Sequence, residues 1–587
     1  MKKRSLLRFT SLSLIMTMCL SSLIGCGDQS SSPADSTVQE STEEAVSGQE
    51  EGGDDAREAD ASETEGMPDD LYIIDMLGVV DSDYMSTDTT IGKVVAEKTG
   101  VAFNYIAYPG DLQEKQAMML AGGDYGELQY MQHNDIVKKY IEAGALINLD
   151  DYKDLMPHFY ERFKEQIPYW RALAPDGGLY KWEMGQPRDD SCPAATWGID
   201  VRSDILEYYG WPELVTASDW IAFLEKAIQD FPTTPDGQET IGLTLPMGEA
   251  WGAQGVVPIA SEYGDTYANA GNDYYIYNVK THQFEDYLLC EEAKESIRFF
   301  NTLYQKGLFD EECFTDTGDT TAQKMSSGRA ICDFYCDFYN STAYVELSKA
   351  GHPEMAYVEL PFQLDSQKGQ KYVTRKVVTD PFDSYGITKN CKDPERLCKL
   401  IDWSCTDEGQ LLLQSGIENV HYTVEDGKRV PTELRIQCTK DSDLANQEGL
   451  LDNIRGLPYI FTRAEDGQPF NLTYEQEYQD THNLNDREKE AYAALGWRNS
   501  QQWWQDNTER VDCGFINSCA LDTTSDLGKV GQKMIDVRLK YTGALIMAED
   551  FDAVWNEMLA EYDKLDHQAV IDAMNEKQAE LDAQLKQ

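Results

Sequence analysis

The sequence predicts an α/β protein whose folded body has two lobes, and three observations support this. Short apolar runs alternate with helical patterns between residues 71 and 131, in the order strand, helix, strand, helix, strand, which is typical of a parallel sheet. About 520 of the 587 residues follow an acidic stretch that ends near residue 66, which is enough for two or more lobes. The chain is 41% hydrophobic and 11% aromatic, so it can fill a large core.

The predicted elements of the first lobe follow from local patterns. The first strand, 71–78, is an apolar run that ends in glycine. A helix over 91–100 has its apolar residues on one face and stops at a glycine. The second strand covers 101–106, and an aspartate with a glutamate three positions on caps a helix over 111–120. The third strand is predicted at 127–131.

Three polar residues of this region are candidates for ligand binding. Asp83, Tyr108 and Asp124 lie in the loops between the predicted elements. Ligands of parallel α/β sheets bind at the carboxyl ends of the strands, so we predict that these residues contact a ligand. For each residue alone, a structural role in a turn is the more common one.

The N-terminus has the pattern of an export signal. Basic residues precede an apolar run over 12–20, which is shorter than a membrane-spanning helix needs. Leu23-Ile24-Gly25-Cys26 resembles the bacterial lipobox, in which the cysteine receives diacylglycerol and palmitate. We therefore predict a signal peptide over 1–25 and lipidation at Cys26, which would anchor the protein on the extracellular face of the cell membrane. The alternative is an ordinary secretory peptide with a chance cysteine.

Residues 26–66 form the predicted tether. After Cys26 this stretch consists almost wholly of Ser, Glu, Asp, Gly, Ala and Thr, which cannot bury enough apolar surface to fold. The net charge of −54 and the absence of basic runs argue against binding to nucleic acid.

The cysteines do not predict a disulfide framework or a metal site. Eleven remain beyond Cys19 and Cys26, and an odd number leaves at least one unpaired within the chain. No Cys-x-x-Cys pair or suitable histidine spacing indicates zinc. We expect most of these cysteines to be small buried hydrophobic residues.

Eight segments of the chain carry recognisable motifs: 121–128, 145–150, 176–180, 197–202, 303–310, 328–335, 403–410 and 416–423. In this order they resemble family 1 extracellular solute-binding proteins, the receptors of carbohydrate ABC importers. The resemblance runs from about Leu71 to the end of the chain and is weakest between about 441 and 542.

The resemblance implies a periplasmic-binding-protein-like fold of class II, with the ligand cleft between two lobes joined by hinge crossovers. Lobe one would comprise 67–190 and 328–388, and lobe two 191–327 and 389–587. The implied partners are a saccharide, most simply an oligosaccharide, and the permease subunits of an ABC importer. We expect a monomer without enzymatic activity.

The resemblance also implies cleft residues beyond the three named above. These are Trp182, Trp197, Glu249, Trp251, Tyr335, Phe338, Tyr385 and Tyr422. In the alginate-binding branch the loop equivalent to 233–239 can hold calcium. Here that loop has only two carboxylates, whereas calcium prefers six to eight oxygens, so calcium is an alternative that the sequence does not favour and we expect no cofactor.

Other functions remain open at this point. An exported carbohydrate-active enzyme would need two suitably spaced carboxylates, and with 104 Asp and Glu the sequence cannot test this. No Gly-x-Ser-x-Gly or His-Glu-x-x-His motif indicates another hydrolase. A surface sensor or adhesin with the same fold, or a peptide or other solute as the ligand, also fits.

Tryptophans near the C-terminus are assigned by their spacing. Trp555 lies on a regular apolar stripe with Phe551 and Met558, which predicts core packing. Trp503 and Trp504 are adjacent, and adjacent side chains point in different directions in a helix or a strand. We therefore expect only one of them to face the core and the other to be exposed.

Overall fold

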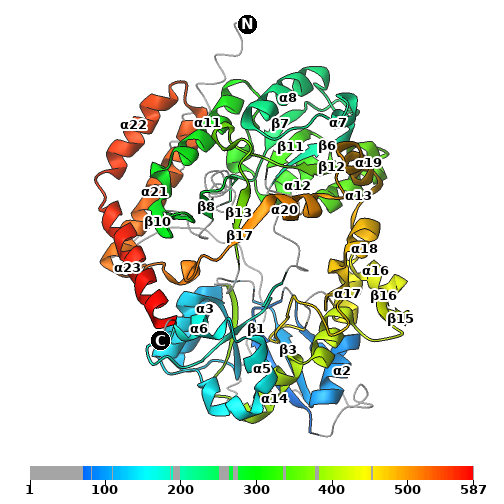
Figure 1. Cartoon of the computed structure of the whole chain (residues 1–587), viewed down its shortest axis with the longest axis vertical. Helices are drawn as coiled ribbons and strands as arrows, with labels where there is room; N and C mark the ends of the chain where they lie inside the picture. Colours follow the sequence, from blue (N-terminus) through cyan, green and yellow to red (C-terminus); the bar gives the residue numbers. More distant parts are fainter. Residues whose placement is uncertain are drawn as a thin grey trace, which may run out of the picture. The chain divides into compact units, whose positions relative to one another are not determined.

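The computed structural model describes residues 70–80, 82–108, 110, 112–185, 187–189, 198–249, 263–268, 275–334, 339–376, 382–450 and 454–585 (Figure 1). Glu65–Gln587 is one compact unit. The predicted signal peptide, Cys26 and the whole of the predicted tether lie outside the described residues. None of the helices that the described residues form is long and apolar enough to cross a membrane.

The first sheet begins as predicted. Strands β1 (Tyr72–Leu77) and β3 (Val101–Ile106) pair in parallel, and β2 (Tyr84–Met85) adds an antiparallel edge. The connecting helix α2 (Thr90–Thr99) starts at Thr89, whose side chain accepts the Gly92 N–H. It ends at Gly100, whose φ of 69° suits a residue without a Cβ.

The remaining strands of this region are antiparallel, which differs from the predicted parallel sheet. Strand β4 (Leu128–His133) lies beside β1 but pairs with β14 (Phe382–Ile387), and β14 also pairs with β5 (Trp182–Glu183). The helices of this part of the chain are α3 (Leu112–Gly122), α4 (Asn134–Glu142), α5 (Pro157–Arg162), α6 (Ile167–Arg171), α14 (Pro394–Ser404), α15 (Asp407–Gln410), α16 (Glu433–Cys438), α17 (Ser442–Glu448) and α18 (Gln476–Tyr478). A hairpin of β15 (Tyr422–Glu425) and β16 (Lys428–Pro431) follows α15.

A second sheet has the order β12-β6-β11-β7. Strands β7 (Ile241–Thr244) and β11 (Ala330–Phe334) run in parallel, whereas β6 (Ile199–Arg202) is antiparallel to β11 and to β12 (Tyr357–Leu360). Smaller sheets join β8 (Tyr267–Ala268), β9 (Tyr275–Asn278) and β10 (Gln283–Asp286), and β13 (Tyr372–Arg375) with β17 (Thr508–Val511).

Ten helices described here accompany the second sheet. Three of them, α11, α21 and α22, pack in a row, and α23 lies against β10 (Figure 1). The helices are α7 (Ser203–Tyr208), α8 (Ala217–Asp230), α11 (Glu291–Gln305), α12 (Gly318–Ser326), α13 (Asn340–Ala350), α19 (Asp486–Leu495), α20 (Ser500–Asn507), α21 (Asp526–Met547), α22 (Phe551–Tyr562) and α23 (His567–Leu585).

Two large hydrophobic cores divide the chain, and their boundaries differ from the predicted lobes. The first core takes its residues from 74–182 and 385–470, and the second from 199–373 and 491–581. Strand β11, which we predicted to return the chain to lobe one, pairs with β6 and β7 in the second sheet. The strand that returns to the first sheet is β14, so 389–470 belongs with the first core rather than with lobe two.

The aromatic and cysteine predictions are mostly confirmed. Trp555 is buried and stacks on Phe551, with 5.9 Å between ring centroids. Trp504 is buried, and Trp503 is partly buried against the same core, so the prediction that one of them is exposed was wrong. The two rings meet edge to face, which lets both pack there. All nine cysteines of the described residues are thiols, and all but Cys391 are buried.

Candidate functional site

A cavity of about 830 Å³ lies between the segment after α16, next to the first core, and the beginnings of α13, α19 and α20, next to the second core. Its lining is dominated by amide and hydroxyl side chains. The lining residues are Asn340, Ser341, Thr342, Tyr344, Val345, Glu359, Thr439, Lys440, Thr473, Gln479, His482, Asn483, Leu484, Asn485, Glu488, Tyr492, Asn499, Ser500 and Gln501.

The second-core wall is built from helix starts. Asn485 caps α19 by accepting the Glu488 N–H at 3.0 Å, and Asn499 caps α20 by accepting the Gln502 N–H at 2.7 Å. Asn340 begins α13, which follows the carboxyl end of β11, and its Nδ2 donates to Asp200 at 2.5 Å. Helix starts carry partial positive charge and backbone N–H groups, which suits oxygen-rich ligands.

The first-core wall is a hydrogen-bonded ladder of polar side chains. Thr439 Oγ1 lies 2.9 Å from the Tyr478 hydroxyl. Gln479 Nε2 donates to the Thr473 carbonyl at 2.5 Å, and its Oε1 accepts from Asn483 Nδ2 at 2.8 Å. These bonds fix the rotamers of the wall, so its polar groups are preorganised for a ligand.

Two ionisable groups of the lining have pKa values that are shifted toward their neutral forms. Burial raises the pKa of Glu488 to about 7, and the Asn485 N–H that it accepts at 2.8 Å opposes this shift. Burial and the nearby Lys440 lower the pKa of His482, whose ring packs on Tyr478 at 4.9 Å. The cavity therefore offers mainly neutral donors and acceptors at pH 7, together with the rings of Tyr344 and Tyr492.

Apart from the cavity, polar residues gather around Asp383 at the carboxyl end of β4. Asp383 adjoins this end because Phe382 pairs with His133. The Tyr130 hydroxyl donates to Asp383 Oδ1 at 2.6 Å, and the backbone of Asp383 is strained, with φ of 52°. Arg455 Nη1 lies 3.9 Å from the sulfur of Met184, whose N–H donates to the Asp383 carbonyl. Strained residues of this kind often occur at ligand sites.

Two predicted residues meet at the carboxyl end of β3. Asp83 is exposed, and its Oδ1 accepts the Ala107 N–H at 2.8 Å. Tyr108 is half-buried after β3, with Lys115 Nζ 5.8 Å from its ring. Both lie at the edge where ligands of such sheets bind.

Asp124 does not lie at the carboxyl end of a strand. It follows α3 and precedes β4, and its N–H donates to the Met119 carbonyl at 3.1 Å. We therefore correct its placement to the turn that ends α3, because the strand after it begins, rather than ends, near this residue.

Three predicted aromatic residues are core residues. Trp182 is 0% exposed, and its Nε1 donates to the Gly456 carbonyl at 3.2 Å. Tyr385 is 1% exposed and stacks with Trp182, while Tyr422 is buried at the start of the β15–β16 hairpin. Because their rings fill the interior, we no longer assign Trp182 and Tyr385 to the site, and Tyr422 is absent from the cavity lining.

Of the remaining predicted site residues, the structure describes only Glu249. Glu249 follows β7, and its Oε1 accepts the Gly318 N–H at the start of α12, at 2.7 Å. Trp197, Trp251, Tyr335 and Phe338 lie outside the described residues.

Several oxygens of the loop at 233–239 take part in hydrogen bonds within the protein. Both carboxylate oxygens of Asp236 accept hydrogen bonds, one from the Thr234 hydroxyl and one from Gln238 Nε2 at 2.7 Å. The Thr234 and Gln238 carbonyls accept backbone N–H groups of the same turn, and Arg329 Nε donates to the Glu239 carbonyl at 3.3 Å. The Asp236 carboxylate and these three carbonyl oxygens are thus already hydrogen-bonded, which does not favour calcium at this loop. Among the described residues no group of three or more His, Cys, Asp or Glu side chains could hold a metal.

The cavity residues were missed by sequence reasoning. We selected acids and aromatic residues at strand ends, whereas the cavity is lined by amides at helix starts. A signal for them is present: the segment from 471 to 501 is rich in Asn and Gln. Their significance depends on the fold, which brings this segment to α13 and Thr439.

Comparisons with known proteins agree with this architecture. No protein-family model matches the chain. The fructooligosaccharide ABC transporter substrate-binding protein FusA of Streptococcus pneumoniae is 26% identical over 325 residues, which cover 52% of this chain and 55% of FusA. An uncharacterised protein of Niallia circulans is 26% identical over 160 residues, 27% of this chain and 59% of that protein.

Solved structures show the same fold over most of the chain. The alginate-binding protein AlgQ2, solved without calcium ion, has a TM-score of 0.61 and 17% identity, covering 87% of this chain and 99% of AlgQ2. FusA in complex with kestose has a TM-score of 0.60 and 16% identity, with coverage of 87% and 99%. An EF-hand mutant of FusA in complex with fructo-nystose has a TM-score of 0.59 and 16% identity, with coverage of 88% and 99%. The predicted resemblance is confirmed: the chain has the two-lobed α/β fold of the solute-binding proteins of carbohydrate ABC importers.

Proposed function

We propose that this protein is an extracellular receptor that captures an oligosaccharide and delivers it to the permease of an ABC importer. The observation that carries the proposal is the cavity of about 830 Å³ and its lining of amides, hydroxyls and tyrosine rings. Sugars present hydroxyls for hydrogen bonds and C–H faces for stacking, and cavities of this size hold small ligands. The named relatives FusA and AlgQ2 are binding proteins for such ligands rather than enzymes.

The proposal gives each wall a role. Residues after α16 and in 473–483 would hold one side of the sugar, while the starts of α13, α19 and α20 would hold the other. Because the walls adjoin different cores, binding would favour the arrangement that brings both walls onto the ligand. The protein would return the saccharide unchanged and act as a monomer.

A thermal-shift screen of the chain without residues 1–66 tests the binding. Kestose, fructo-nystose and alginate oligosaccharides are the first probes, with a mixture of short peptides as the comparison. A ligand at about 100 times its dissociation constant should stabilise the protein by roughly 2.7 kcal/mol. Stabilisation by peptides alone would overturn the saccharide class, and shortened oligosaccharide in the recovered ligand would indicate a hydrolase.

We also propose that Cys26 carries the lipid anchor, followed by a disordered tether. Because the lipid is the only membrane attachment that we infer, Cys26→Ala should release the protein into the medium or leave it unprocessed. Cell fractionation with an antibody to the folded body measures this. Mature Cys26→Ala protein in the membrane fraction would contradict the anchor.

A further inference from the structure

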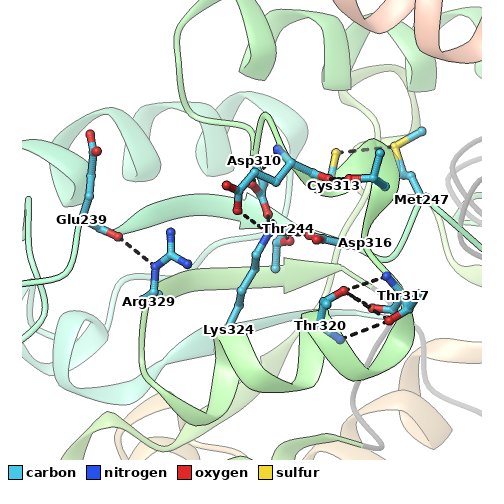
Figure 2. A network of polar contacts seen from close by, with 12 residues as sticks. Glu239, Thr244, Met247, Asp310, Cys313, Asp316, Thr317, Thr320, Lys324 and Arg329 are labelled. Atoms are coloured by element: carbon cyan, nitrogen blue, oxygen red, sulfur yellow. Dashed lines mark hydrogen bonds and ion pairs between the residues drawn. The ribbon is translucent and has the colours of Figure 1, made fainter. Parts of the chain in front are cut away.

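A buried lysine joins three segments beside the loop that follows β7. Lys324 Nζ lies 2.7 Å from Oδ2 of Asp310 and 2.5 Å from Oδ2 of Asp316. The Thr244 hydroxyl, on β7 itself, donates to the same Asp310 oxygen at 2.7 Å. Figure 2 shows Lys324 reaching from α12 toward these groups. We call Thr244, Asp310, Asp316 and Lys324 the Lys324 junction.

The junction is centred on a cation. The Lys324, Asp310 and Asp316 side chains are only 8%, 3% and 8% exposed, so water screens their charges little. Burial raises the pKa of Asp316 even though Lys324 opposes the shift. Without the ammonium, two buried carboxylates would repel each other, so Lys324 holds the β7 end, the segment at 310–316 and α12 together.

Three contacts link the loop at 245–249 to Asp316 of this junction and to two neighbouring residues, Cys313 and Gly318. The Gly248 N–H donates to the Asp316 carbonyl at 2.9 Å. Glu249 Oε1 accepts the Gly318 N–H at 2.7 Å, and the sulfurs of Met247 and Cys313 lie 3.8 Å apart (Figure 2 shows the sulfur contact). The position of Glu249 therefore depends on the segment that Lys324 holds through Asp316.

The same elements adjoin the cavity. Strand β7 runs parallel to β11, with Thr244 opposite Asp333, so the carboxyl ends of both strands lie at one edge of the sheet. Helix α13, which lines the cavity, follows β11 at that edge. A Cβ added to Gly318 would lie 2.2 Å from the hydroxyl of Tyr339, which precedes the lining residue Asn340. The start of α12 thus packs directly against the start of α13.

We propose that Lys324 is a positioning residue for the saccharide site, acting as a built-in cation that fixes the 245–249 loop and the start of α12 against α13. The proposal rests on the proposed function. Lys324 does not line the cavity; it acts through Asp310 and Asp316 on groups at the same sheet edge.

Hydrogen–deuterium exchange of the ligand-free protein tests the positioning. In Lys324→Ala the amides of 247–249 and Gly318, all hydrogen-bonded here, should exchange at least about tenfold faster, while distant amides of α22 keep their rates. Lys306→Ala is the matched control, because its ion pair with Glu225 at 2.5 Å is exposed on the same core. Unchanged exchange at 247–249 in folded Lys324→Ala would overturn the proposal.

Chemical rescue separates the charge from the packing. The missing part of the side chain in Lys324→Ala corresponds to n-propylammonium, which should restore slow exchange at 247–249, whereas n-propanol should not. Equal rescue by the alcohol would show that Lys324 only fills space. If Lys324→Ala does not fold, Asp316→Asn removes one charged contact and should raise exchange at Gly248 and Gly318 by at least about threefold; unchanged rates there would equally overturn the proposal.

Kestose affinity completes the test. Calorimetric titration should show at least about tenfold weaker kestose binding for Lys324→Ala, and wild-type affinity for Lys306→Ala. Wild-type affinity in Lys324→Ala with loosened loops would overturn the positioning role. If the wild-type protein binds no saccharide at all, the proposed function fails, while the exchange and rescue experiments still decide whether Lys324 fixes the loop.

Discussion

The Glu488 side chain both caps a helix and lines the cavity. Its Oε2 accepts the Asn485 N–H at 2.8 Å, which completes the capping box of α19, and it also lines the cavity. Burial raises its pKa from the ordinary glutamate value to about 7. A capping carboxylate is usually fully charged. The Glu488 carboxylate still caps α19, but its raised pKa means that it is partly protonated near neutral pH.

The raised pKa predicts a pH-dependent stability. The folded protein binds a proton more tightly than the unfolded chain, so this stabilisation is complete below about pH 4.5 and is lost as the pH rises through about 7. Glu488→Gln keeps an acceptor for the cap but cannot ionise. It should melt like the wild type at pH 4 and be more stable at pH 8, by about 1 to 3 kcal/mol.

Calorimetric melting at both pH values measures the effect. Glu490→Gln is the control, because that glutamate lies on the same helix but is 59% exposed beside Arg487. A variant Glu488→Gln that loses stability at pH 8 would show that the charged cap outweighs burial.

Single residues were predictable where the local pattern decides their environment. Asp83 and Tyr108 lie at a strand end because β3 ends where its apolar run ends. Trp182 and Tyr385 could not be placed in this way, because their burial comes from strands β5 and β14, which are 203 positions apart in the Tyr385–Trp182 register. Instead of Tyr385, it is Asp383, two residues earlier, that lies at the carboxyl end of β4.

At the scale of elements, the turn at 233–239 is closed by its own bonds. The Thr234 hydroxyl donates to Asp236 and accepts the Gln238 N–H at 3.0 Å. These bonds lower the pKa of Asp236. The turn therefore has internal partners for the groups that would otherwise bind a cation.

From the hydrogen bonds of this turn we predict that the melting temperature of the protein does not depend on calcium. EDTA and millimolar calcium should each change the melting temperature by less than about 1 °C, since the Asp236 oxygens of this turn already accept hydrogen bonds within the protein. Thr234→Val should cost about 1 to 2 kcal/mol, because it removes the hydroxyl that donates to Asp236 and accepts the Gln238 N–H. Thr233→Val on the exposed side of the turn should cost little. A melting temperature that falls with EDTA and recovers with calcium would contradict the account.

Elements with a regular period were predicted well. Strand 101–106 agrees with β3 in both limits, and the helix over 91–100 agrees closely with α2. The pairing of elements was less predictable: β4 follows a strand–helix pattern, yet it pairs with β14, which lies more than 200 residues later. Period-2 patterns identify a strand but not its partner.

For the whole molecule, the two-lobed class could be predicted but its boundaries could not. The chain moves from the first core to the second, returns at β14, and reaches the second core again between 470 and 491. We placed the return at β11, whose five residues are all buried and would suit either sheet. The late crossover through 473–483 is the segment that supplies one wall of the cavity.

The central claim is that this cavity holds a saccharide, and Tyr344 offers the most direct test. Its half-buried ring lines the cavity, and loss of a stacked ring typically costs about 1 to 3 kcal/mol. Calorimetric titration with the saccharide that gives the largest thermal shift should therefore show at least about tenfold weaker binding for Tyr344→Ala. Tyr208→Ala, which removes a 64% exposed ring outside the cavity, should bind like the wild type. Wild-type affinity for Tyr344→Ala would contradict the account.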